Sequence, residues 1–301
     1  MNKKNIIIGI VGPTNSGKST LLNNIIGEKL SIVTHKAQTT RSGLRGLRII
    51  DNIQMVFIDT PGIFDARTKF EKAMLENAFS VLGDVDLIYL LIDCKKSLSD
   101  FDPIFLKEIE RYKDKVFLIL NKIDLIQRSY LLEKVKKFND MISFKETFLI
   151  SAESGDGVEN LLKITCNESS DGPWLYPEDQ IADTSMSRMA SEITREKIFL
   201  FVHEEVPYLS TVETDSWTQN RNKSITVEQT IFVGRKNHVG IILGKGGKMI
   251  KTIGIASRID LEKIVDTKIN LKINVKFKKD WVEQEEHYEK IGLNYLDKKE
   301  T

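Results

Sequence analysis

The sequence predicts two domains, an α/β domain with a mostly parallel sheet followed by a smaller α+β domain. A chain of 301 residues is longer than one typical core requires. As far as residue 150, short apolar runs alternate with longer mixed segments, the pattern of parallel strands joined by helices. After residue 187 the expected order of elements changes to αββααβ. The two halves therefore have different architectures.

Five apolar runs in the first half are expected to be strands, because each is nearly continuous in Ile, Val, Leu and Phe, like strands buried on both faces. They span residues 6–11, 55–59, 86–92, 116–120 and 147–150. In sheets of this kind the ligand binds beyond the carboxyl ends of the strands. The residues that follow each run are therefore the candidates for a site.

The domain bounds follow from a change in composition. Residues 167–187 are rich in Ser, Asp, Pro and Gly and show neither the helical nor the strand period of hydrophobic residues. This segment is predicted to be a linker between domains at 1–166 and 188–285. Within the second domain we expect a helix at 188–203, strands at 210–217 and 224–233, a short apolar segment, a glycine loop between the last two helices, a helix ending near 265 and a strand at 268–277. Residues 286–301 form a charged tail.

Composition excludes several classes of protein. The formal net charge is +1, so partners must be inferred from local clusters. Cys94 and Cys166 lie far apart and match no zinc or disulfide pattern, which suits a reducing, cytoplasmic setting. No run reaches the roughly 18 apolar residues of a membrane span, so any contact with the inner membrane would be peripheral, on its cytoplasmic side. The histidines show no mutual metal spacing; they are His35, His203, His238 and His287.

A phosphate-binding loop is predicted directly after the first strand, where GPTNSGKST precedes an apolar helix. Its spacing lets backbone N–H groups and the helix N-terminus surround a β-phosphate. Lys18 would neutralise the β- and γ-phosphates, and Ser19 would ligate Mg²⁺. A glycine turn that merely opens a helix is the alternative, which the strand–loop–helix context disfavours. The nucleotide-binding candidates here are Gly12, Pro13, Thr14, Asn15, Ser16, Gly17, Lys18, Ser19 and Thr20.

A second candidate segment, DTPG, follows the strand at 55–59. Asp59 is placed to hold the Mg²⁺ shell, and Gly62 to offer its N–H to a γ-phosphate. The nucleotide-binding candidates of this segment are Asp59, Thr60, Pro61, Gly62 and Ile63.

Guanine selectivity is predicted from the ends of the last two strands. NKID supplies Asp124, whose two carboxylate oxygens accept the N1–H and 2-amino protons of guanine, a pair that adenine lacks. The Lys122 stem would cover the base face, and the backbone of Ser151 and Ala152 would meet the guanine O6. With Asn121, these residues complete the nucleotide-binding candidates.

Together these motifs identify a resemblance. GPTNSGKST, KAQTTR at 36–41, DTPG, NKID and SAESG, followed by one αββααβ module, resemble the Era family of bacterial Ras-like GTPases over nearly the whole chain. The resemblance implies a Ras-like G domain joined to a type II KH domain, GTP hydrolysis to GDP and phosphate, and a role in small (30S) ribosomal subunit assembly through the 3′ end of 16S rRNA. It also implies that a switch threonine, Thr40 or alternatively Thr39, joins Ser19 and Asp59 around Mg²⁺.

The stretch LGKGGKMIKTIGI in the second domain contains the GxxG loop that this family carries. It is not a second nucleotide loop, because Gly240 to Gly244 is one residue short of the required spacing. A solvated basic helix entrance is the alternative to RNA binding, in which glycines let a sugar-phosphate backbone approach and lysines neutralise it. The RNA-binding candidates are Gly244, Lys245, Gly246, Gly247, Lys248 and Lys251.

Hydrolysis is expected to differ from that of Ras-like enzymes, in which a glutamine after the DxxG glycine positions water. Ile63 stands at that place and offers no hydrogen bond. Asn15 resembles the loop asparagine of GTPases that use K⁺ beside the phosphates, which makes K⁺ a hypothesis here; a simple loop hydrogen bond is the alternative. The residues expected to carry hydrolysis are Lys18, Ser19, Thr40, Gly62 and Asn15.

Two rival functions stay open at this point. One is a GTP-gated adaptor for a membrane or protein partner in cell-cycle regulation, for which turnover would be incidental. The other is a tRNA-modification GTPase, disfavoured because this sequence lacks the C-terminal cysteine and extra helical domain of such enzymes. No stable protein partner is predicted from the sequence.

Overall fold

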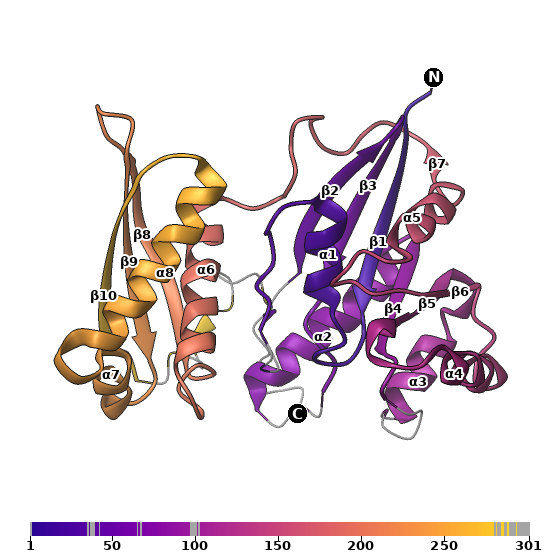
Figure 1. Cartoon of the computed structure of the whole chain (residues 1–301), viewed down its shortest axis with the longest axis horizontal. Helices are drawn as coiled ribbons and strands as arrows, with labels where there is room; N and C mark the ends of the chain where they lie inside the picture. The colour runs from indigo at the N-terminus through magenta and orange to yellow at the C-terminus, as the bar shows by residue number, and fades with distance from the viewer. Residues whose placement is uncertain are drawn as a thin grey trace. The chain divides into compact units, whose positions relative to one another are not determined.

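The computed structural model describes residues 2–34, 36, 40–41, 43–64, 66, 68–96, 101, 103–279, 281, 284–285, 288 and 293. These residues form two compact units. The first contains residues up to 31 together with 40–183, and the second contains residues 32–34 and 36 together with those from 184 onward. Each unit has its own sheet (Figure 1).

The first unit is built on a seven-stranded, mostly parallel sheet with the order β2-β3-β1-β4-β5-β6, in which β7 pairs with β1. The strands are β1 (Lys4–Val11), β2 (Leu44–Ile50), β3 (Ile53–Asp59), β4 (Leu87–Asp93), β5 (Val116–Asn121), β6 (Glu146–Leu149) and β7 (Ser170–Asp171). The β1, β3, β4, β5 and β6 strands pair in parallel, whereas β2 and β7 are antiparallel to their neighbours. The five expected strands are confirmed; β2 and β7 were not expected.

Helices cover both faces of this sheet, so that the parallel strands are buried between two apolar cores (Figure 1). The helices are α1 (Lys18–Ile26), α2 (Lys69–Asp84), α3 (Pro103–Glu110), α4 (Arg128–Met141) and α5 (Val158–Cys166). Leu21 of α1 and Leu161 of α5 lie in one core, while Leu82 of α2, Phe105 of α3 and Phe138 of α4 lie in the other. Each such side chain contributes about 1.5–3 kcal/mol of burial free energy.

Most of the segment expected to be a linker, as far as residue 183, belongs to the first unit. Gln54 is fully buried in β3, and its side chain accepts hydrogen bonds from the backbone N–H groups of Leu175 (2.7 Å) and Tyr176 (3.0 Å). The N–H of Leu47 in β2 donates to the carbonyl of Ile181 at 2.9 Å. Hydrogen bonds therefore hold residues 175–181 against the first unit, and such bonds leave no hydrophobic period in the sequence from which they could be predicted.

The second unit has the expected αββααβ order. Its elements are α6 (Met186–Phe201), β8 (Ser210–Gln219), β9 (Ile225–Val233), α7 (Lys236–Leu243), the single turn η4 (Lys245–Gly247), α8 (Lys248–Val265) and β10 (Ile269–Phe277). The sheet order is β10-β9-β8, with β10 parallel and β8 antiparallel to β9. Ile198 of α6, Ile242 of α7 and Ile253 of α8 pack with Ile231 and Val233 of β9. The three helices therefore share one face of the sheet (Figure 1).

In the part of the chain that the structure describes, no helix has both the length and the apolar character needed to cross a bilayer.

Candidate functional site

The loop between β1 and α1 wraps the side chain of Lys18. Gly17 caps α1 with φ +99°, and a Cβ there would lie 2.2 Å from the Asn121 side-chain nitrogen, so only glycine fits. The Lys18 ammonium donates to the carbonyls of Gly12 (2.9 Å) and Pro13 (2.8 Å). Burial lowers the pKa of Lys18 to about 8, and the Asp59 carboxylate partly offsets this. The ammonium is thus fixed at the N-terminus of α1.

Asp59, the last residue of β3, collects three hydroxyl groups. Its Oδ2 accepts from the hydroxyls of Ser31 (2.7 Å), Ser19 (2.8 Å) and Thr40 (3.4 Å). The carboxylate is fully buried, and its Oδ1 has no hydrogen-bond partner among the described residues. Burial raises the pKa of Asp59, opposed by the ammonium of Lys18. Thr39, the alternative to Thr40, lies outside the described residues.

This arrangement suits a hard divalent cation, because hydroxyl and carboxylate oxygens gather around a buried carboxylate oxygen that lacks a partner. It does not resemble a zinc site: where the chain is described, no three His, Cys, Asp or Glu side chains are grouped so that they could hold a metal ion. Sequence analysis missed Ser31, because an isolated serine beyond α1 belongs to no motif.

The DTPG segment packs directly against the phosphate loop. The N–H of Ile63 donates to the carbonyl of Gly12 at 3.0 Å, and a Cβ on Gly62 would lie 2.8 Å from the Thr14 methyl carbon. The Thr60 hydroxyl donates at 2.9 Å to a backbone carbonyl of β1. The Ile63 side chain packs against the core beneath α2, α3 and α4. Gly62 is therefore held beside the phosphate loop, where its N–H is expected to donate to a γ-phosphate.

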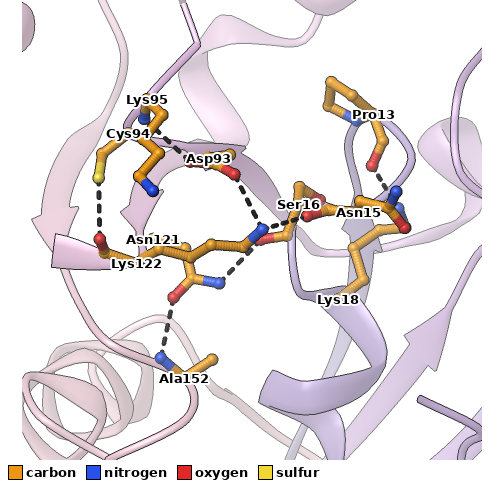
Figure 2. Close-up of polar contacts among 10 residues, drawn as sticks. All are labelled: Pro13, Asn15, Ser16, Lys18, Asp93, Cys94, Lys95, Asn121, Lys122 and Ala152. Carbon is orange, nitrogen blue, oxygen red and sulfur yellow. Dashed lines mark hydrogen bonds and ion pairs between the residues drawn. The ribbon is translucent and has the colours of Figure 1, made fainter. Parts of the chain in front are cut away.

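Asn121, at the end of β5, joins three loops (Figure 2). Its side-chain Nδ2 donates to the carbonyl of Ser16 at 2.8 Å, and its Oδ1 accepts from the N–H of Ala152 at 2.8 Å. The N–H of Ser151 donates to the carbonyl of Asp156 at 2.9 Å. Both backbone donors expected near guanine O6 are therefore engaged within the protein, so a base oxygen would share the Ala152 N–H with Asn121.

Lys122 lies between the phosphate loop and the end of β4 (Figure 2). Its ammonium donates to the carbonyl of Asn15 at 2.6 Å and to Asp93 Oδ2 at 2.8 Å. Asp124 follows in the short turn η3 (Ile123–Leu125) and is exposed. An exposed carboxylate at this edge of the sheet is available to a ligand, as guanine recognition requires.

In the second unit, the GKGG loop exposes backbone between α7 and α8. Gly246 and Gly247 have φ +61° and +73°, and a Cβ on either would meet nothing within 4 Å. Lys245, Lys248 and Lys251 are exposed, and none has an ion pair with a described residue. The loop therefore presents an open backbone beside positive charge.

A groove of about 320 Å³ runs between α8 and β10. Lys251 and Arg258 line it together with the apolar Ile250, Ile255 and Leu271. Among the isoleucines on both sides of the glycine loop, Ile250 lines the groove, Ile242 and Ile253 lie in the core, and Ile241 is exposed. Arg258 was missed, although it lies seven residues after Lys251, a spacing that places both on one helical face.

The fold and the site define a class, that of P-loop GTPases that carry a second, KH-type domain. A family model described as "50S ribosome-binding GTPase" matches residues 7–122, and one described as "KH domain" matches residues 205–282. The GTPase Era of Agrobacterium fabrum (strain C58) is 43% identical over 288 residues, covering 96% of this chain and 91% of that protein. That of Sinorhizobium medicae is 43% identical over 291 residues, covering 96% and 93%.

Solved structures show the same similarity. A crystal structure of Era in complex with MgGDPNP and nucleotides 1506–1542 of 16S ribosomal RNA has a TM-score of 0.89 at 32% identity, covering 96% of this chain and 99% of that one. A variant of Aquifex aeolicus Era bound to GDP·AlF4⁻ has a TM-score of 0.90 at 32% identity with the same coverage. The chain therefore belongs to the GTPase Era family, with a Ras-like G domain, a KH domain and GTP-hydrolysing activity.

Proposed function

We propose that this GTPase binds the 3′ end of 16S rRNA and acts in assembly of the small (30S) ribosomal subunit. The observation that carries the proposal is the groove between α8 and β10, whose basic side chains adjoin an open glycine loop. Support comes from the relative whose solved structure holds a fragment of 16S ribosomal RNA at 32% identity over nearly the whole chain.

For the nucleotide, the roles follow from where side chains are fixed. Lys18 reaches the β- and γ-phosphates from the start of α1, where backbone N–H groups also converge. Asp124 reads guanine with its exposed carboxylate, and the Lys122 stem lies along the base face. Asn121 holds these parts together through Ser16 and Ala152. These four residues all belong to the nucleotide-binding candidates named from the sequence motifs.

Ser19, Thr40 and Asp59 would hold Mg²⁺, with the Ser31 hydroxyl fixing the Asp59 carboxylate through the same oxygen, Oδ2. When bound, Mg²⁺ neutralises charge on the phosphate oxygens. The protein's own contribution is a buried carboxylate whose pKa burial raises, while the Lys18 ammonium and the hydroxyl donors act in the opposite direction.

Hydrolysis proceeds without a side-chain amide at the Ile63 position, because that residue is apolar and its partly buried side chain packs against the core. We place K⁺ beside Asn15 as the second cation. Asn15 is exposed, has φ +61° and projects from the tip of the phosphate loop. K⁺ there would add positive charge near the phosphates, where arginine serves in other GTPases.

For RNA, the groove combines both elements of single-strand binding. Lys251 and Arg258 neutralise phosphates, while Ile250, Ile255 and Leu271 offer apolar surface to bases. Gly246 and Gly247 let the sugar-phosphate backbone approach the loop closely. This arrangement favours a single strand over a duplex, whose bases are not accessible to such a surface.

The test is RNA affinity of a variant carrying Lys251→Ala and Arg258→Ala. Its matched control carries Lys107→Ala and Lys136→Ala, which removes two exposed positive charges from α3 and α4. The probe is an RNA of the 3′-terminal sequence of 16S rRNA, compared with the same nucleotides in scrambled order. Each lost phosphate contact lowers the salt dependence by about 0.7 in log–log slope for a single strand.

We expect the groove variant to bind at least about tenfold more weakly and with a shallower salt slope, and the control to bind like the native protein. Preference for the native 3′ sequence over the scrambled one supports the rRNA assignment. Unchanged affinity of the groove variant would contradict the proposal and favour the rival function, a GTP-gated adaptor for a membrane or protein partner.

A further inference from the structure

Asp93 is a buried-strand residue outside every nucleotide motif, yet it lies against one of them. It ends β4, and in the parallel pairing of β4 with β5 it stands opposite Asn121. Lys122, the first residue after β5, therefore lies beside Asp93. The Asp93 Oδ2 accepts a hydrogen bond from the Lys122 ammonium at 2.8 Å.

The same ammonium has a second acceptor, the carbonyl of Asn15 in the phosphate loop, at 2.6 Å (Figure 2). The Lys122 ammonium thus connects the end of β4 to the phosphate loop. The side chains of Asp93 and Lys122 are 17% and 30% exposed. By contrast, the Glu133–Lys137 pair on α4 has both side chains more than 60% exposed, where such a pair contributes little.

Asp93 is itself fixed. Its second oxygen, Oδ1, accepts from the N–H of Lys95 at 2.9 Å, and its carbonyl accepts from the N–H of Lys96 at 2.9 Å. Because Oδ1 is held by the Lys95 N–H, the carboxylate presents Oδ2 to the lysine in one orientation, so the lysine ammonium has a defined position.

The backbone of Lys122 is fixed by the residue that follows β4. Lys122 has φ +66°, a conformation that non-glycine residues rarely adopt. Its carbonyl accepts from the Cys94 thiol at 3.0 Å and from the N–H of Leu125 at 3.0 Å. Two consecutive residues, Asp93 at the end of β4 and Cys94 directly after it, therefore hold the ammonium and the backbone carbonyl of Lys122 (Figure 2).

We propose that Asp93 is a positioning residue for nucleotide binding, which acts through Lys122. It fixes the lysine so that the stem lies flat along guanine while the ammonium ties the base site to the phosphate loop. This inference rests on the proposed role of Lys122 in the nucleotide site. Without the Asp93 charge, the lysine loses one of two acceptors and the two loops lose a common tether.

A double-mutant cycle tests this on the full chain, with GDP as the ligand. Asp93→Asn removes the charge and keeps an oxygen for the N–H of Lys95. Lys122→Met removes the ammonium and keeps an apolar stem. The matched control, Glu133→Gln, breaks an exposed carboxylate–lysine pair in the same unit. Titration with GDP counts the binding-competent fraction of each variant, so partial unfolding is not mistaken for weak binding.

We expect D93N to weaken GDP binding by about tenfold, through faster dissociation, and to act on KM for GTP more than on kcat. In the K122M background, D93N should change affinity by less than about twofold, because its partner is already absent. E133Q should bind like the native protein.

Equal loss in both backgrounds would overturn the inference, because Asp93 would then act independently of Lys122. Native affinity of D93N alone would do the same. If K122M itself binds GDP normally, the proposed role of Lys122 fails and the inference falls with it, an outcome distinct from failure of Asp93 alone.

Discussion

The hydroxyl of Ser19 lies 2.8 Å from Oδ2 of Asp59, which joins the first turn of α1 to the end of β3. The two residues are 40 positions apart in sequence, and the β1–β3 pairing brings their loops together. Thr40 and Ser31 complete the cluster around the same oxygen. The proposed divalent-cation site at the phosphate loop depends on this contact.

Asp59→Asn should separate folding from function. Because burial is the main cause that raises the pKa of Asp59, ionisation of this carboxyl costs folding free energy at neutral pH. The neutral amide removes that cost, so we expect the nucleotide-free variant to unfold at the native temperature or above it. Mg²⁺ should strengthen its nucleotide binding about 10–100-fold less than in the native protein. Calorimetric unfolding and GDP titration with and without Mg²⁺ measure both; a native Mg²⁺ response contradicts the assignment.

Asp124→Asn should exchange guanine for xanthine. The substitution replaces two acceptors by one donor and one acceptor, which suits the 2-oxo group of xanthine rather than a 2-amino group. We expect GDP affinity to fall on the order of 100-fold while xanthosine diphosphate binds better. Because Asp124 is exposed, stability should be unaffected, and thermal unfolding serves as the control. Retained GDP affinity would show that NKID does not read the base.

Turnover should depend on the identity of the monovalent cation. With the apolar Ile63 packed against the core, no amide at that position orients water, and K⁺ beside Asn15 would supply part of the missing charge. We expect single-turnover GTP hydrolysis about tenfold or more faster in K⁺ than in Na⁺ at equal ionic strength, and Asn15→Ala to remove the difference. Equal rates in the two salts would exclude K⁺ catalysis.

Cys94 should resist alkylation until strongly alkaline pH. Burial raises the pKa of its thiol to about 11, with the charge of Asp93 acting in the same direction. The thiolate is the reactive form, so native Cys94 should react with iodoacetamide far more slowly at pH 8 than the unfolded chain does. Since the folded pKa exceeds the unfolded one, stability falls as pH rises above about 9. Mass spectrometry of a Cys166→Ser variant follows Cys94 alone; rapid labelling at neutral pH contradicts this prediction.

The hydrophobic pattern of the sequence predicted most of the strands and helices of both units. The apolar runs of β1, β3, β4 and β5 are recognisable because burial on both faces requires continuous hydrophobic sequence. The glycine-rich loops followed from spacing. The short apolar run after β9 belongs to α7, one of the two helices that flank the GKGG loop.

Other features depend on pairing that no local pattern records. The β2 strand mixes Arg45, Gly46 and Arg48 with aliphatic residues because it forms the edge of the sheet and only part of it is buried. Ser31 and Asp93 reach the site through tertiary proximity, without a motif of their own. Composition likewise gave no sign that residues 175–181 pair with β2 and β3.

The most direct test of the account is crosslinking of the protein to ribosomal particles in the presence of GTP or GDP, followed by mapping of the attached RNA. A photoreactive amino acid at Ile255, in the wall of the groove, would report on its occupant. The account predicts crosslinks to the 3′ end of the small-subunit rRNA whose yield depends on the nucleotide and is lost in the Lys251→Ala, Arg258→Ala variant. Crosslinks to other RNA, or to protein alone, would contradict it.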